Sequence, residues 1–143
     1  RLHTREISAY GGVVDAMPRY AAFFMFMMLA SVGLPGTSGF VGEMLVLVGA
    51  WNRADWVAIL AATGLILGAC YMLWLYRRVV FGRAEKPEIL ELEALSGREF
   101  LIFVPLTVFV LWFGVYPSTL LDIMELAVED VLVQIGLQQT ALR

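Results

Sequence analysis

The stretch LASVGLPGTSGFVGEMLVLVGAW, Leu29 to Trp51, decides the fold of this chain. It is apolar almost throughout and carries a single carboxylate, Glu43. Four residues that disfavour a regular helix interrupt it: Gly33, Pro35, Gly36 and Gly39. Its hydrophobicity is typical of a membrane segment, so the helix breaker and the lone acid both need a physical reason.

The same stretch lies within the longest of three apolar spans. They run from about residue 20 to 50, 56 to 75, and 100 to 121. Hydrophobic residues make up 60% of the chain, charged residues make up 16%, and the mean hydropathy is +0.78, whereas soluble domains are about half apolar and one-quarter charged. Because about 20 consecutive apolar residues cross a bilayer, we predict an all-α transmembrane chain, a single membrane domain over residues 1–143.

The first span is too long to cross a bilayer as one straight helix. A continuous helix over residues 20–50 would be about 45 Å long, against a hydrocarbon core of about 30 Å. Pro35 also removes a backbone donor, and the freed backbone groups must be buried in protein or line a watery cavity. We therefore predict a broken helix whose halves meet across residues 35–39, the first ending near Leu34 and the second starting near Phe40. A proline kink without functional consequence is the alternative.

The basic residues indicate an orientation. Eight of the ten Lys and Arg residues precede span one or lie between spans two and three: Arg1, Arg5, Arg19, Arg77, Arg78, Arg83, Lys86 and Arg98. Positive residues gather on the cytoplasmic side of membrane proteins. The start of the chain and the second link are thus predicted on the negative side, and the short NRAD link and the C-terminus on the other.

Two segments outside the spans are predicted as interfacial helices. EILELEALSGREF, residues 88–100, interleaves apolar residues with acids, and after Pro117 apolar residues recur at helical spacing with acids on the other face. An acidic polar face is unfavourable for anionic lipid, so the second helix favours a protein partner. The net charge of −3 provides no basic surface for nucleic acid.

Glu43 is the candidate for chemistry. Charged groups at membrane depth cost at least a few kcal/mol and commonly mark ion or proton pathways. Burial favours the neutral form of a carboxyl, whereas a helix N-terminus favours the charged form. With a second half-helix starting near Phe40, Glu43 would lie in its first turn. Two interpretations remain open: Glu43 transfers protons, or it only stabilises the start of a helix.

Other candidates carry weaker signals. His3 has a side chain that titrates near neutrality and is a candidate proton relay, although a loop residue with a structural role is the simpler interpretation. Thr37 and Ser38 are natural helix caps, with a secondary role in binding water or ions. The sequence contains no phosphate loop and no set of metal ligands. We therefore expect neither a cofactor nor a metal site in this chain.

The motif GLPGTSGFVGE, with LHTREI before it, resembles the M-type antiporter-like subunits of respiratory complex I and their mitochondrial counterparts, the NADH-ubiquinone oxidoreductase chain 4 family. The likeness continues in LILGACYMLWLYRRVVFG, residues 65–82, and in FGVYPSTLL, residues 113–121. The resemblance implies that the three spans are equivalent to helices 12–14 of a 14-helix subunit and that the chain is its C-terminal portion. The broken helix of the family carries a charged residue, which is typically lysine in the L-type and N-type subunits and in the D-type subunits of Na⁺/H⁺ antiporters. Glutamate at position 43 is similar to the M-type.

The resemblance also implies a function and partners. The chain would be a proton-translocating membrane-arm subunit of NADH:quinone oxidoreductase, with Glu43 transferring protons and with no redox centre of its own. Flavin mononucleotide, iron–sulfur clusters and quinone would lie elsewhere in the complex. The partners would be the lipid bilayer, the N-terminal part of the same subunit, and the L-type and N-type subunits, in a bacterial plasma membrane or mitochondrial inner membrane. The alternatives are a subunit of a multisubunit cation/proton antiporter and a purely structural membrane subunit.

Overall fold

The chain is all-helical over the residues that the structure describes, which confirms the predicted fold class. The computed structural model describes residue 4, residues 6–82 and residues 87–141. The elements in chain order are η1 (Ile7–Ala9), α1 (Val13–Ala16), α2 (Pro18–Ser31), α3 (Ser38–Arg53), α4 (Asp55–Val80), α5 (Pro87–Leu90), α6 (Gly97–Val115) and α7 (Ser118–Ala141).

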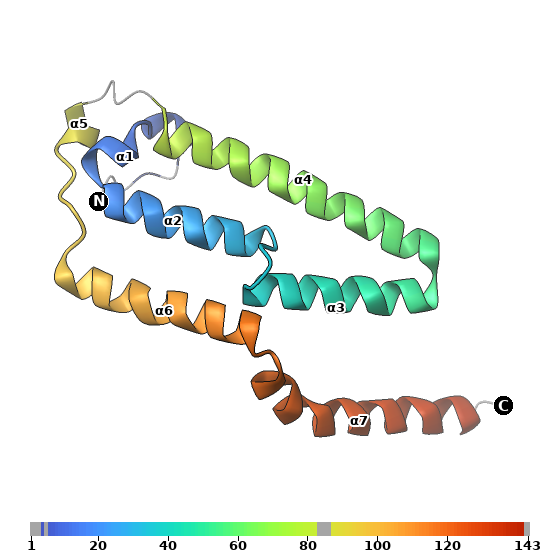
Figure 1. Ribbon diagram of the computed structural model, residues 1–143. Helices are drawn as coiled ribbons and strands as arrows, with labels where there is room; N and C mark the ends of the chain where they lie inside the picture. The colour runs from blue at the N-terminus through green and yellow to red at the C-terminus, as the bar shows by residue number, and fades with distance from the viewer. Residues whose placement is uncertain (1–3, 5, 83–86, 142–143) are drawn as a thin grey trace.

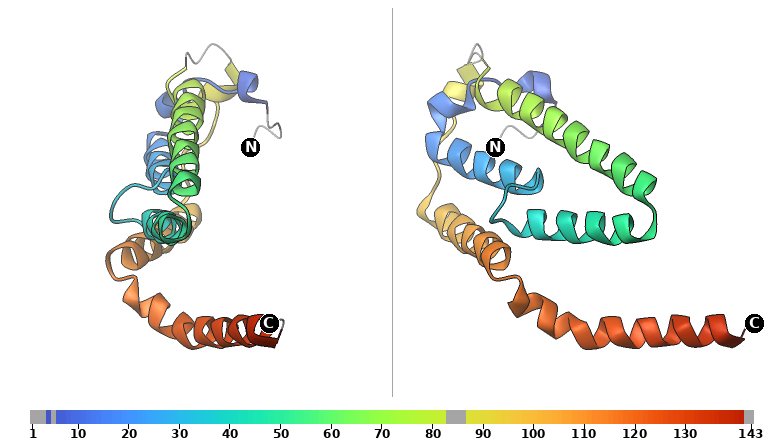
Figure 2. Two further views of the ribbon diagram at one scale, coloured as in Figure 1. Left: turned by 90° about the vertical axis from the view of Figure 1, so that its right-hand side faces the viewer. Right: turned by 45° about the vertical axis from the view of Figure 1, so that its right-hand side comes forward.

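The helices form a thin bundle around the junction of α2 and α3 (Figure 1). α4 returns from the end of α3 and lies against both α3 and α2. α6 lies on the other side of α2, runs in the same direction, and ends beside the start of α3. α7 extends away from this bundle and contacts only α6 among the described elements (Figures 1 and 2). The α2–α3 junction is therefore held between α4 and α6.

The first predicted span is interrupted as expected. α2 begins with Pro18, whose fixed φ suits the first helical position, and ends at Ser31. α3 begins at Ser38 and continues to Arg53, so residues 32–37 form the break. The break lies beside the middle of α4 rather than at either end (Figure 1).

Aromatic and apolar side chains join α2 to its neighbours. Phe23 stacks on Phe103 of α6 with ring centroids 5.4 Å apart. On the α4 side, Tyr76 packs with Ala21, Met28 and Val80, and its hydroxyl donates to the Ala21 carbonyl at 3.1 Å. These contacts fix α2 between the two longer helices.

Most of the remaining apolar surface is uncovered. Over the described residues, two helices, α4 and α6, are long and apolar enough to cross a membrane. In their most apolar windows only 6% and 0% of the residues, respectively, are buried inside the chain. Such surface needs lipid or other protein segments against it. α2 and α3 are each shorter, as two halves of one interrupted span should be.

The structure differs from the sequence-based boundaries around α6. The helix starts at Gly97 and ends at Val115, so the third span lies upstream of the predicted 100–121. Pro105 lies inside the helix. The surface helix predicted over 88–100 is reduced to α5, residues 87–90. The cause is a capping box, which ends the preceding extended segment at Ser96 and starts α6 there.

The capping box at the start of α6 is expected to stabilise the folded chain. The Glu99 carboxylate accepts hydrogen bonds from the Ser96 amide at 2.8 Å and from its hydroxyl at 3.1 Å, and the Ser96 hydroxyl accepts from the Glu99 amide at 3.4 Å. Ser96→Ala should lower the free energy of unfolding by about 1 kcal/mol, the usual cost of losing such a cap. Thermal unfolding of the purified protein measures it. Glu99→Gln, which keeps an acceptor at the same place, should have a smaller effect, and equal effects of the two variants would contradict this account.

Candidate functional site: the helix break and Glu43

α2 ends in a Schellman motif built around Gly33. The Leu34 amide donates to the Leu29 carbonyl at 3.0 Å, and the Gly33 amide donates to the Ala30 carbonyl at 3.3 Å. Gly33 has φ +87°, the left-handed conformation that this motif requires and that glycine adopts without steric cost. Pro35 follows two residues later, where it cannot continue the helix. The sequence GLP therefore terminates α2 by itself.

Thr37 closes the break in an unexpected way. It occupies the N-cap position of α3, but its side chain does not cap that helix. Its hydroxyl donates instead to the Leu34 carbonyl at 2.7 Å, and its amide donates to the same carbonyl at 3.1 Å. Thr37 is fully buried. The first amides of α3 consequently receive no side-chain acceptor from Thr37.

Glu43 lies in the second turn of α3 and reaches back to the break. It is the sixth residue of the helix, whose first turn contains no acid, so the expectation that Glu43 sits in the first turn is wrong. The helix starts two residues earlier than predicted, at Ser38. The half-buried Glu43 side chain lies directly on Gly33, where a Cβ would meet the carboxylate Oε2 and stand 3.2 Å from Cδ. The carboxyl therefore lies at the C-terminal end of α2.

Two further glycines allow close approach at the same place. A Cβ on Gly39 would collide with the Ala30 carbonyl oxygen of α2. A Cβ on Gly114 of α6 would collide with the Gly36 carbonyl oxygen and with the Thr37 backbone. The backbone of the break thus touches α6, and the first turn of α3 touches the end of α2.

Comparisons with known proteins find similar sequences among membrane subunits. The family model described as NADH:quinone oxidoreductase/Mrp antiporter, transmembrane, matches residues 1–68. NADH-quinone oxidoreductase subunit M of Rhodobacter capsulatus is 54% identical over 123 residues, which cover 86% of this chain and 24% of that protein. NADH-ubiquinone oxidoreductase chain 4 of Marchantia polymorpha is 52% identical over 136 residues, which cover 95% of this chain and 27% of that protein. The chain belongs to this antiporter family.

A solved structure shares the fold of this antiporter-family chain. Respiratory complex I from Thermus thermophilus with bound NADH contains a chain that matches with a TM-score of 0.74 and 36% identity, over 83% of this chain and 25% of that one. The chain spans about a quarter of the length of the relatives it matches. The resemblance seen in GLPGTSGFVGE is therefore confirmed at the level of the family.

The structure brings most of the sequence-predicted site residues of this antiporter-family chain together. Gly33, Pro35 and Gly36 lie in the break, and Gly36, with φ +89°, is the second left-handed glycine there. Thr37 closes the break, whereas Ser38 and Gly39 already belong to α3. Gly39 was expected in the break, but the helix begins before it and the residue serves a close contact instead. His3 lies outside the described residues.

Sequence reasoning missed Gly114. It occurs in FGVYPSTLL, which contributed only to the family resemblance, and nothing in that segment indicated which backbone the glycine would touch. The sequence signal that could have indicated it is the position of Gly114 three residues before Pro117, near the end of the third apolar span.

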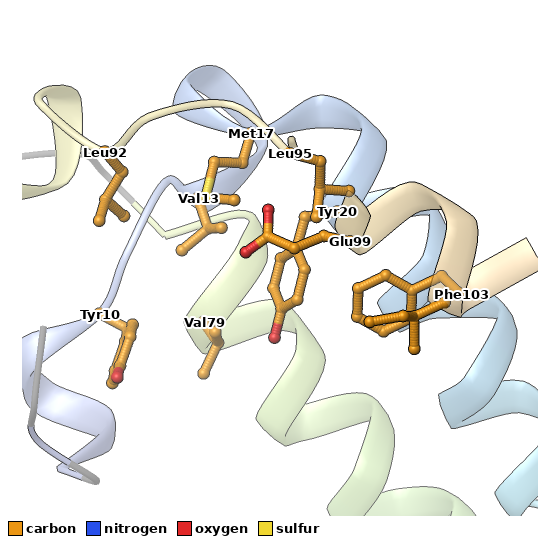
Figure 3. A pocket seen from close by; sticks show the side chains of 10 residues that line it. Tyr10, Val13, Met17, Tyr20, Val79, Leu92, Leu95, Glu99 and Phe103 are labelled. Carbon is orange, nitrogen blue, oxygen red and sulfur yellow. The ribbon is translucent and has the colours of Figure 1, made fainter. Parts of the chain in front are cut away.

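A cavity of about 380 Å³ lies at the other end of the bundle, between α1, the starts of α2 and α6, and the end of α4. Figure 3 shows Glu99 beside Tyr20 in this cavity, which Leu92 and Leu95 also line. Glu43 and the break do not line it. Among the described residues, no group of three or more His, Cys, Asp or Glu side chains gathers as a metal site.

Proposed function

We propose that this chain forms part of a proton-translocating membrane-arm subunit of NADH:quinone oxidoreductase, in which Glu43 takes up and releases a proton at the break between α2 and α3. The observation that carries the proposal is the position of the Glu43 carboxyl on Gly33 at the end of α2. Among the described residues it has no hydrogen-bond or salt-bridge partner. An acid held at a helix break without a fixed partner is suited to exchange protons with water.

The helix ends supply the electrostatic part of this mechanism. The C-terminal end of a helix carries partial negative charge and favours cations, whereas the N-terminal end favours anions. Glu43 sits on α3 but places its carboxyl at the C-terminal end of α2. Protonation of the carboxylate removes a negative charge from that negative end, and deprotonation restores it. A change of charge elsewhere in the membrane arm can therefore shift the proton occupancy of Glu43.

A purely structural role for Glu43 receives less support. An acid stabilises a helix start within the first turn, and Glu43 lies beyond it, with its side chain turned to the break. Residue 43 also takes no part in the turn before α3, which Thr37 closes through the Leu34 carbonyl.

The proposal extends to location and partners. The uncovered apolar faces of α4 and α6 would contact lipid and the remaining part of the same subunit, in a bacterial plasma membrane or mitochondrial inner membrane. L-type and N-type antiporter-like subunits would be its neighbours in the membrane arm. Flavin, iron–sulfur clusters and quinone would be bound by other parts of the enzyme, which this chain serves without a redox centre of its own.

A multisubunit cation/proton antiporter is the second candidate, since the matching family model includes Mrp antiporters. The relatives at 54% and 52% identity carry the names of NADH oxidoreductase subunits, and position 43 is glutamate rather than the lysine typical of antiporter D-type subunits, which favours the first function.

Purification of the native assembly separates the two functions. We expect an affinity tag on the polypeptide containing this chain to co-purify flavin and iron–sulfur subunits, identified by mass spectrometry, together with NADH-dependent quinone reduction. Recovery of membrane subunits alone, with Na⁺/H⁺ exchange in proteoliposomes and no quinone reduction, would establish the antiporter instead.

A further inference from the structure

Gly114 of α6 packs against the backbone of the break. It is one residue before the end of the helix, and a Cβ there would collide with the Gly36 carbonyl oxygen and with Cα and the carbonyl carbon of Thr37. These atoms all belong to the backbone, so no change of side-chain rotamer could relieve the collision. Any side chain at position 114 must move α6 or the break.

The first turn of α3, directly after the break, lies close to α2 as well. Gly39 lies so close to the Ala30 carbonyl oxygen that a Cβ would collide with it. Between the two contacts, Thr37 is completely buried and anchors its amide and hydroxyl on one carbonyl, that of Leu34. A buried residue whose amide and hydroxyl are both bonded, and which lies between two close contacts, has little freedom to move.

We propose that Gly114 is a positioning residue, which holds the Gly36–Thr37 backbone against α6 and thereby fixes the break in the shape that places the Glu43 carboxyl on Gly33. Gly33 lies within the same six-residue break, three residues before Gly36. A displacement at Gly36 and Thr37 alters the start of α3 and with it the direction in which Glu43 projects. The consequence for proton transfer rests on the function proposed above, whereas the positioning itself does not.

Hydrogen–deuterium exchange in the assembled complex tests the positioning directly. With Gly114→Ala, the amides of Leu34 and Thr37 should exchange about tenfold faster, because overpacking of a close contact raises the population of open states. Two matched controls, Gly97→Ala on the same helix and Gly64→Ala on α4, add a Cβ where nothing lies within 4 Å. Unchanged exchange in Gly114→Ala, or equal acceleration in the controls, would overturn the proposal.

The ratio of protons translocated to electrons transferred separates this inference from the proposed function. Gly114→Ala should lower the ratio in correctly assembled complex, whereas a residue that matters only for stability would lower the amount of complex and leave the ratio unchanged. If Glu43→Gln translocates normally while Gly114→Ala still accelerates exchange, the proposed function fails and the positioning role stands.

A measurement on the unaltered complex covers the case in which Gly114→Ala does not assemble. The proposal expects the Leu34 and Thr37 amides of the wild-type break to be as protected as those inside α4. Exchange at the rate of an open loop would contradict it.

Discussion

Replacing Glu43 by glutamine is expected to lower proton translocation at least about tenfold in the assembled enzyme, a lower bound that lies below the roughly 10²–10⁴-fold that a positioned proton-transfer group contributes. Glutamine has nearly the same shape and fits against Gly33, but its amide cannot take up and release a proton at neutral pH. Translocation is measured in proteoliposomes during NADH-driven quinone reduction, after native electrophoresis has confirmed that the complex is assembled.

Two variants at the same position sharpen this prediction. Glu43→Asp keeps a carboxyl but shortens the reach toward Gly33, so we expect partial activity. Glu43→Lys should also retain part of the activity, because the family resemblance implies lysine at the matching place in the L-type and N-type subunits. Wild-type translocation by Glu43→Gln, with the break intact, would leave only a structural role for this residue and would remove the proposed mechanism.

The interruption of the first span could be predicted from sequence because it depends on local chemistry. Gly33, Leu34 and Pro35 contain a left-handed position followed by a residue that cannot continue a helix, and the structure ends α2 there with a Schellman motif. The length of the apolar run required such a break. The residue at which α3 starts was harder to predict. Thr37 uses its hydroxyl to close the turn rather than to cap the helix, and single-sequence rules do not distinguish these two roles.

The geometry of the site could not be predicted, because it depends on how helices far apart in sequence approach each other. The isolation of Glu43 among apolar neighbours predicts it as the site residue, but its contact with Gly33 depends on the angle between α2 and α3. Gly114 is separated from Gly36 by more than two helices, and no periodicity relates the two. The early start of α6, by contrast, was readable in principle, since Ser96 and Glu99 have the spacing of a capping box.

Gly33→Ala is expected to impair both folding and proton transfer, for two separable reasons. An L-residue at φ +87° costs roughly 1–2 kcal/mol in the left-handed conformation. The new Cβ would also occupy the space of the Glu43 carboxylate and force it away from the end of α2. We therefore expect a lower free energy of unfolding and, in the fraction that assembles, a lower ratio of protons translocated to electrons transferred.

Gly36→Ala provides the matched control for this variant. Gly36 has φ +89°, so alanine there carries nearly the same conformational cost, but nothing lies within 4 Å of the added Cβ. The two variants should lose similar stability, and only Gly33→Ala should lower the proton-to-electron ratio. Combining Gly33→Ala with Glu43→Gln should lower translocation no further than Glu43→Gln alone, because both act on one carboxyl. Equal proton-to-electron ratios in Gly33→Ala and Gly36→Ala would show that the contact between Gly33 and Glu43 has no part in proton transfer.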